Sequence, residues 1–175
     1  MKKFELTREF ITFLGRKLFR IKALVEFGDV KAGELGGYVE KEENINHEGN
    51  AWVYGNARVY GDARVSGDAR VYGNARVSGD AWVYGNARVY GDALVVKQED
   101  IIFTAAKFGT IFRTTTAYRT TDGIQINCGC FSGNLEEFRE QIIQTRDGRM
   151  RKKYLYHADE IEMYFDLDLE KREEK

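Results

Sequence analysis

Arginine, threonine and tyrosine side chains are concentrated in one short stretch of the chain, FRTTTAYRTT. Guanidinium groups donate paired hydrogen bonds to phosphate oxygens, and hydroxyl groups add further donors. If the stretch is a β-strand, Arg113, Thr115 and Arg119 lie on one side of it, because strand side chains alternate. Thr116 and Tyr118 then lie on the other side. These five residues are candidates for binding a phosphate-bearing ligand. The alternative is an exposed edge strand that polar side chains keep soluble.

A second set of candidates lies in a repeated phrase of six residues. Arg70 and Arg88 are separated by three copies of the phrase, and Tyr72 and Tyr90 follow each of them by two positions. If three copies complete one turn of the fold, these residues stack on one face. Rings beside guanidinium groups would suit a flat anionic ligand such as a nucleotide. The alternative is that these side chains only pack against each other on a sheet face that contacts solvent or another subunit.

Residues suited to catalysis or metal binding are few. The two histidines, His47 and His157, are far apart in the sequence, and no His/Cys/Asp/Glu cluster has the spacing of metal ligands. We expect no catalytic residue, metal or cofactor, and we expect His47 to face inward at the end of the core. Cys128 and Cys130 are expected to be small buried hydrophobes rather than nucleophiles.

The elements that must position these residues follow from the repeat. Seven hexads run from Ala51 to Asp92, reading AWVYGN, ARVYGD, ARVSGD, ARVYGN, ARVSGD, AWVYGN and ARVYGD. Six is even, so Ala and Val always point inward while Trp, Tyr and Arg always point outward, Trp52 and Trp82 included. Glycine followed by Asn or Asp supplies a corner with positive φ. The period therefore predicts a three-sided parallel β-solenoid of about three coils.

The hexad resembles the repeat of the left-handed parallel β-helices, the hexapeptide-repeat superfamily. The resemblance implies a left-handed coil and a homo-oligomer, with a trimer favoured. It also implies one alternative function, an acyl-CoA-dependent acyltransferase with His47 as general base. The hexads of this chain lack the long loops that build the acyl-CoA site in those enzymes.

The flanking sequence completes a mainly β fold with a small α+β domain at its end. Alternating residues before the repeat predict a hairpin, with a turn at Gly15-Arg16-Lys17, and a cap. After the repeat we expect three strands, then a helix with an apolar stripe and a second helix from about Met150. The stripe comprises Leu135, Phe138, Ile142 and Ile143. The expected domains are 1–44, the hairpin and cap; 45–98, the β-helix; and 99–175, the α+β domain.

Composition limits the partners of the chain. The net charge is −1, so no overall field draws it to nucleic acid or to an anionic membrane. No apolar run approaches eighteen residues, and the start, MKKFELTREF, has no secretory core. The three coils would span only about 14 Å, which is short for a long nucleic acid. We expect a cytoplasmic protein that binds neither membranes nor long nucleic acids.

The segment from GTIFRTTTAYRT to CGCFSGNLEEF resembles one found in small phage-encoded proteins, where it can follow a hexapeptide helix. This resemblance implies a phage or prophage protein acting in the host cytoplasm. With no catalytic constellation, we expect a non-catalytic oligomeric binding protein. It would sequester a nucleotide-like host defence signal or block a host protein. The alternatives are the acyltransferase and a structural or assembly protein.

Overall fold

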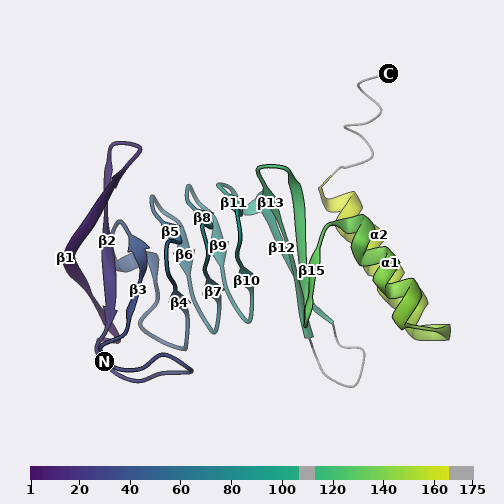
Figure 1. Cartoon of the computed structure of the whole chain (residues 1–175), viewed down its shortest axis with the longest axis horizontal. Helices are drawn as coiled ribbons and strands as arrows, with labels where there is room; N and C mark the ends of the chain where they lie inside the picture. The colour runs from purple at the N-terminus through teal and green to yellow at the C-terminus, as the bar shows by residue number, and fades with distance from the viewer. Residues whose placement is uncertain (107–112, 166–175) are drawn as a thin grey trace. The chain divides into compact units, whose positions relative to one another are not determined.

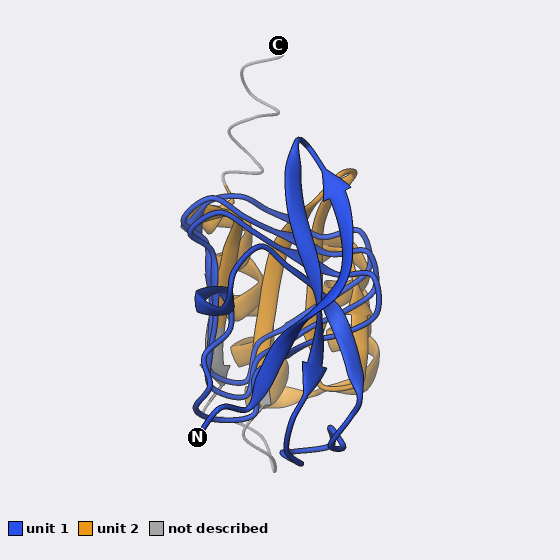
Figure 2. Cartoon of the chain, turned by 90° about the vertical axis from the view of Figure 1, so that its left-hand side faces the viewer, with its two compact units in different colours: residues 1–98 blue, residues 99–175 orange. Residues whose placement is uncertain are grey.

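The computed structural model describes residues 1–106 and 113–165, without the side chains of residues 104–106 and 113. The chain forms two compact units, Met1–Gln98 and Glu99–Lys175. Figure 2 colours them blue and orange. Each unit has its own sheets, and each is described by itself below.

Eight two-residue strands form the coils of the first unit (Figure 1). Each strand pairs in parallel with the strand eighteen positions further on, as Arg58 pairs with Arg76 and Trp52 with Arg70. This register produces the three faces that the hexad period predicts, and the coils superpose when they are seen along their stacking direction (Figure 2). The strands are β4 (Trp52–Val53), β5 (Arg58–Val59), β6 (Arg64–Val65), β7 (Arg70–Val71), β8 (Arg76–Val77), β9 (Trp82–Val83), β10 (Arg88–Val89) and β11 (Leu94–Val95).

The core of the coils confirms the predicted alternation. Every alanine and valine of the seven hexads is buried, whereas most of the intervening arginines and tyrosines reach the surface. The glycine of each hexad has a positive φ and turns the chain at a corner. Residues 51–96 therefore form a β-solenoid of three coils.

Trp52 corrects one expectation, because it is fully buried although it occupies an outward position of its hexad. The ring of Phe4 lies 6.0 Å from it and that of Phe27 lies 5.3 Å from it, both edge-on. The N-terminal segment thus covers this end of the face. Trp82 occupies the same hexad position and is 50% exposed, as expected.

The N-terminal segment continues one sheet of the solenoid. Strands β1 (Phe4–Phe13) and β2 (Arg16–Ala23) form an antiparallel hairpin, and β3 (Leu35–Val39) joins it to β5. The resulting sheet has the order β1-β2-β3-β5-β8-β11. The hairpin turns at Leu14 and Gly15, which both have positive φ, one residue before the expected position.

The second unit packs two helices on one sheet. Strands β12 (Ile101–Ala106), β13 (Arg113–Thr120), β14 (Gly123–Cys128) and β15 (Phe131–Gly133) are antiparallel neighbours in that order. Helices α1 (Leu135–Thr145) and α2 (Gly148–Tyr164) follow. Their buried residues pack with Ile124, Ile126 and Cys128 of the sheet.

Three details of the second unit differ from expectation. The short strand β15 is a fourth strand where three were predicted. Ile143 is 51% exposed, so it does not belong to the apolar stripe of α1. Strand β13 lies between β12 and β14, and so it is an interior strand rather than an exposed edge.

Candidate functional site

A groove of about 510 Å³ lies on the third face of the solenoid, within the first unit. Its floor is formed by β6 and β9, whose residues Arg64 and Trp82 stand opposite each other because they are eighteen positions apart. The indole N–H of Trp82 donates to Ser66 Oγ at 3.0 Å, and its ring lies 5.2 Å from that of Tyr84. The groove therefore contains an oriented aromatic surface beside a guanidinium group. Its lining comprises Met1, Glu42, Glu43, Ile45, Asn46, His47, Glu48, Arg64, Val65, Ser66 and Trp82.

The rim of the groove is held by the segment that precedes the repeat. The buried side-chain amide of Asn44 donates to the carbonyls of Gly61, at 3.2 Å, and Ala63, at 2.8 Å. Ile45 forms a parallel bridge with Val65. These contacts fix the short 3₁₀ helix Glu42–Asn44 and the residues after it against the coil.

His47 lies on this rim and is held from two sides. Its ring stacks on Phe4 at 4.5 Å, and its Nδ1 accepts the backbone N–H of Lys3 at 3.2 Å. Its Nε2 lies 3.7 Å from a carboxylate oxygen of Glu42. The side chain is 31% exposed and lines the groove, so it is only partly buried where it packs on Phe4.

The contacts of His47 determine where its proton lies. Because Nδ1 accepts a hydrogen bond, the neutral ring carries its proton on Nε2, the nitrogen nearer Glu42. In this tautomer Nε2 is a donor and cannot accept a proton as a general base.

The charges in the groove are unevenly compensated. Glu42 is bound by Lys2 at 2.7 Å. Within the described residues, Arg64, Glu43 and Glu48 have side chains that form no hydrogen bond or ion pair. One guanidinium and two carboxylates in the same groove are therefore available to a ligand.

The first face carries the predicted ligand residues Arg70, Arg88 and Tyr72. More of its polar side chains are hydrogen-bonded or ion-paired within the protein than those of the groove. The Arg70 guanidinium binds the carboxylate of Asp29 and donates to the Tyr54 hydroxyl at 3.2 Å. The hydrogen bond from Arg70 holds the pKa of Asp29 below its usual value. Burial raises the pKa of Tyr54 to about 12, although the charge of Arg70 opposes this.

The rings of this face mostly contact each other. Tyr72 and Tyr90 stack at 4.8 Å with an interplanar angle of 21°, and Tyr54 meets Tyr72 edge-on at 6.3 Å. The structure therefore brings the predicted rings and Arg70 together, but the charge of Arg70 is already neutralised by Asp29.

The predicted ligand residues of β13 do not form an exposed platform. Thr115, Thr116 and Tyr118 are buried, because β13 is an interior strand. Arg119 forms an ion pair with Asp100 at 3.5 Å, and its guanidinium lies over the ring of Phe165. Thr115 Oγ1 donates to Cys128 Sγ at 3.2 Å, and Asn127 Nδ2 donates to the Tyr118 hydroxyl at 2.8 Å. The side chain of Arg113 lies outside the described residues.

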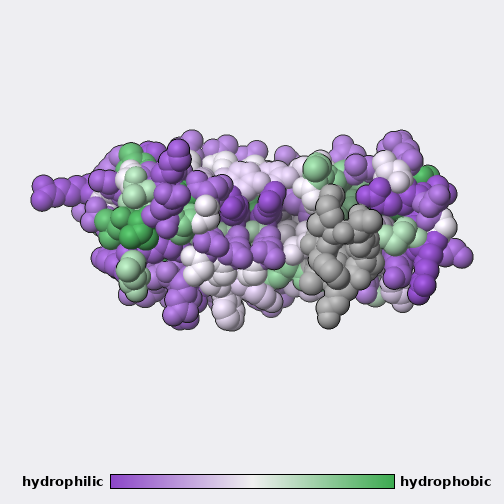
Figure 3. Space-filling model, turned by 90° about the horizontal axis from the view of Figure 1, so that it is seen from below, coloured by the Kyte–Doolittle hydropathy of each residue, from purple (hydrophilic) through white to green (hydrophobic). Residues whose placement is uncertain are grey.

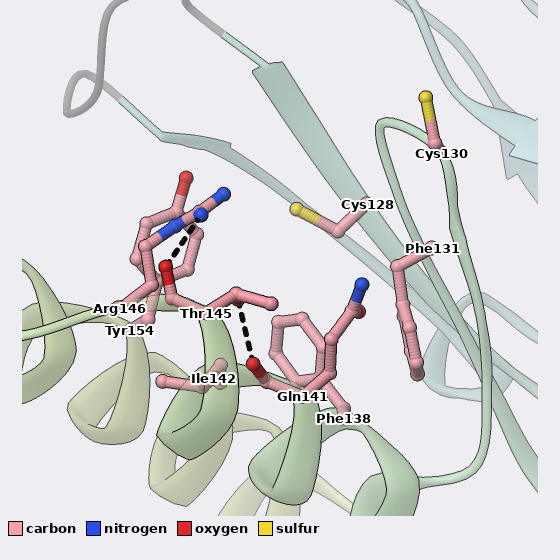
Figure 4. A pocket seen from close by; sticks show the side chains of 9 residues that line it. All are labelled: Cys128, Cys130, Phe131, Phe138, Gln141, Ile142, Thr145, Arg146 and Tyr154. Atoms are coloured by element: carbon pink, nitrogen blue, oxygen red, sulfur yellow. Dashed lines mark hydrogen bonds between the residues drawn. The ribbon is translucent and has the colours of Figure 1, made fainter.

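A second, smaller pocket of about 70 Å³ lies between β14, β15 and the helices of the second unit (Figure 4). Cys128 is buried as expected, but Cys130 is exposed, and its side chain points away from that of Cys128 (Figure 4). Arg146 lies at the opposite side, where its guanidinium covers the ring of Tyr154.

Within residues 1–106 and 113–165, no three His, Cys, Asp or Glu side chains are placed to hold a metal ion. Neither of the two helices in the same residues is long and apolar enough to cross a membrane.

Arg64 and Trp82 are eighteen positions apart, so the predicted three-sided solenoid places them on one face, but neither was among the predicted ligand residues. The selection failed because the other half of the groove comes from residues 42–48, which lie outside the repeat and have no period. The available signal was the acidic run EKEEN, which is separated from the first hexad by six residues.

One comparison with known proteins gave a match. Residues 51–67, 57–71, 69–85 and 81–96 match the family described as YdcK Beta solenoid repeat. The matched segments cover the hexads and leave the N-terminal hairpin and the second unit unmatched. No curated protein matches the chain.

Proposed function

We propose that this chain is a non-catalytic binding protein that holds a small, flat, anionic ligand of the nucleotide type in the Arg64–Trp82 groove. The observation that carries the proposal is the half-exposed indole of Trp82 opposite the guanidinium of Arg64, which forms no hydrogen bond or ion pair within residues 1–106 and 113–165. The groove volume of about 510 Å³ lies within the range of small-molecule sites, roughly 300–1,000 Å³.

The chemistry of the lining suits the three parts of a ribonucleotide. A base stacks on the indole, which favours planar π systems. The phosphate is bound by the Arg64 fork. Glu43 and Glu48 can accept hydrogen bonds from ribose hydroxyls, as acidic residues do in dinucleotide sites. The carboxylates also penalise ligands that carry phosphate at both ends.

Binding without turnover agrees with the state of His47. Its Nδ1 accepts a backbone N–H, so the acyltransferase alternative lacks the free basic nitrogen that it requires. A site that binds and does not convert its ligand suits sequestration. We therefore propose that the protein, encoded by a phage and acting in the host cytoplasm as an oligomer, removes a nucleotide-like defence signal from solution.

Calorimetry with a panel of mononucleotides, cyclic nucleotides and ADP-ribose-type nucleotides tests the proposal. At least one should bind, and chromatography should recover it unchanged. Arg64→Gln and Trp82→Ala should each weaken binding about tenfold or more, since a charge-assisted hydrogen bond and base stacking each contribute about 1–3 kcal/mol.

The control variant is Arg88→Gln, which removes an exposed arginine on the first face and should leave binding unchanged. If Arg88→Gln weakens binding and Arg64→Gln does not, the site lies on the first face and the proposed groove is wrong. A flat response across the panel would favour inhibition of a host protein instead. Consumption of acetyl-CoA that His47→Ala abolishes would establish the acyltransferase.

A further inference from the structure

Helix α2 presents a basic face away from the core of the second unit. Arg149, Lys152 and Tyr156 follow each other at spacings of three and four residues, so they lie on one side of the helix. The opposite side carries Tyr154 and Ala158, which are buried. We call Arg149, Lys152 and Tyr156 the α2 basic face.

The cations of this face are available. Arg149 and Lys152 are exposed, and within the described residues their side chains form no hydrogen bond or ion pair. The surrounding sequence increases the local positive charge, because five of the eight residues from 146 to 153 are cationic and only Asp147 opposes them. This concentration contrasts with the net charge of −1 for the whole chain.

Tyr156 adds an aromatic surface to the charge. Its side chain is 71% exposed, one helical turn after Lys152. A large exposed ring one turn after a pair of cations, here Lys152 and Lys153, is typical of surfaces on which unpaired bases stack.

The structure favours a nucleic-acid strand over a lipid surface. A helix that binds a membrane needs an apolar face to insert, but the apolar face of α2 is occupied by the core of its own unit. Figure 3 looks onto the part of the second unit where α1 ends and α2 begins, and the surface there is mostly hydrophilic. Stacking on Tyr156 requires an unpaired base, which excludes an intact duplex.

We propose that the α2 basic face binds single-stranded nucleic acid, with Arg149 and Lys152 on the phosphates and Tyr156 stacked on a base. The face spans about 10 Å along the helix at 1.5 Å per residue, so it contacts a short stretch of strand. A short strand bound on α2 is compatible with the expectation that the solenoid faces are too short to bind a long nucleic acid.

Fluorescence anisotropy with labelled twelve-residue oligonucleotides, dT12 and rU12, tests the proposal on the full chain. Binding should weaken about sevenfold between 50 and 200 mM salt, because two phosphate contacts give a logarithmic slope of about −1.4 for a single strand. The double variant Arg149→Glu, Lys152→Glu should lose at least tenfold in affinity. Tyr156→Ala should lose about tenfold without a change in the salt slope.

The matched control is Arg8→Glu, Lys31→Glu, which changes the net charge equally on exposed residues of the first unit and should bind as the wild type does. Circular dichroism melts verify that each variant is folded. An absence of binding at 50 mM salt, or an equal loss in the control variant, would overturn the proposal. Binding to vesicles containing phosphatidylserine but not to oligonucleotides would overturn it in favour of a lipid surface. The nucleotide panel uses the other unit, so the two proposals fail separately.

Discussion

Lys3 shows how one residue can join the N-terminal segment to the solenoid. Its ammonium group is buried and donates to the carbonyls of Gly49, at 3.3 Å, and Ala51, at 2.9 Å. The same nitrogen lies 4.7 Å from the centre of the Phe27 ring. Carbonyls at the first coil, which have no preceding coil to bind them, are thus satisfied by a side chain.

Lys3 should make stability depend on pH. Burial lowers its pKa to about 8, although the charge of Asp68 acts to raise it. The unfolded state keeps the proton to about pH 10.4. Between these values the unfolded state binds more protons, so the free energy of unfolding should rise with pH. Urea unfolding at pH 7, 8.5 and 9.5 should show the wild type gaining stability relative to Lys3→Met. The difference in the free energy of unfolding between the wild type and the exposed Lys17→Met variant should not change with pH. If the difference between the wild type and Lys3→Met is also constant with pH, the pKa of Lys3 is not lowered by folding.

The two tryptophans at equivalent hexad positions should respond differently to truncation. Trp52→Ala should cost about 3–5 kcal/mol, because it empties a fully buried site. Trp82→Ala should cost about 0.5 kcal/mol, as for an exposed substitution. Trp52→Phe should cost much less than Trp52→Ala, because the buried Trp52 indole N–H has no partner to lose. Denaturant unfolding measures all three, and equal costs at the two positions would show that Trp52 is not covered in solution.

At the scale of single elements, the hexad corners are the most constrained positions. Gly73 and Gly91 turn the same corner in successive coils, both with positive φ. A Cβ at Gly73 would meet the backbone nitrogen of Gly91 at 2.9 Å, whereas a Cβ at Gly91 would meet nothing within 4 Å. The two glycines therefore differ in packing and not in conformation.

Alanine substitutions at these glycines separate the two effects. Gly91→Ala should cost about 1–2 kcal/mol, the strain of a left-handed conformation for a residue with a Cβ. Gly73→Ala should cost clearly more, because the next coil must also move. Thermal and urea unfolding provide the comparison. If Gly91→Ala were the more harmful change, the coils would not stack in the register described.

The sequence predicted the elements whose residues repeat and missed those that depend on distant partners. Ala and Val in every hexad were sufficient to predict the core, because the alternation survives each turn. The helix that the Asn134–Glu137 capping box starts was predicted from its apolar stripe. For β13 the sequence left open a ligand-binding strand or an exposed edge, because nothing in its own residues shows that β12 and β14 flank it. The burial of Trp52 was missed for the same reason, since Phe4 and Phe27 lie outside the repeat.

At the scale of the whole molecule, the three faces of the solenoid differ in how they are completed. The second face, formed by β5, β8 and β11, is extended by the N-terminal hairpin, and the third face, formed by β6 and β9, is bordered by the acidic rim of the groove. The first face retains its column of Tyr54, Tyr72 and Tyr90. We infer that it is the face on which copies of the chain associate, because Tyr and Arg are favoured at interface cores.

Sedimentation should test this association. The wild type should have a mass of three times 20.1 kDa if the expected trimer forms. Arg88→Glu should lower that mass at the same concentration, because it places a carboxylate on the first face. Arg8→Glu, on the hairpin, should not. A wild type that remains at 20.1 kDa throughout the concentration series would rule out the oligomer.

The pairing of each residue with the one eighteen positions further on also sets how this protein can change in length. Deleting residues 57–74 removes one whole coil, and every remaining strand except β9 still finds a strand of its own face, while β9 takes the place of β6 beside Ile45. Deleting a single hexad would instead rotate all later hexads by one third of a turn. The acidic rim of the groove would then border outward side chains that belong to a different face. Insertions and deletions in the lineage should therefore occur in steps of one coil, each worth about 4.8 Å of height. The length of the solenoid can therefore change only by whole coils.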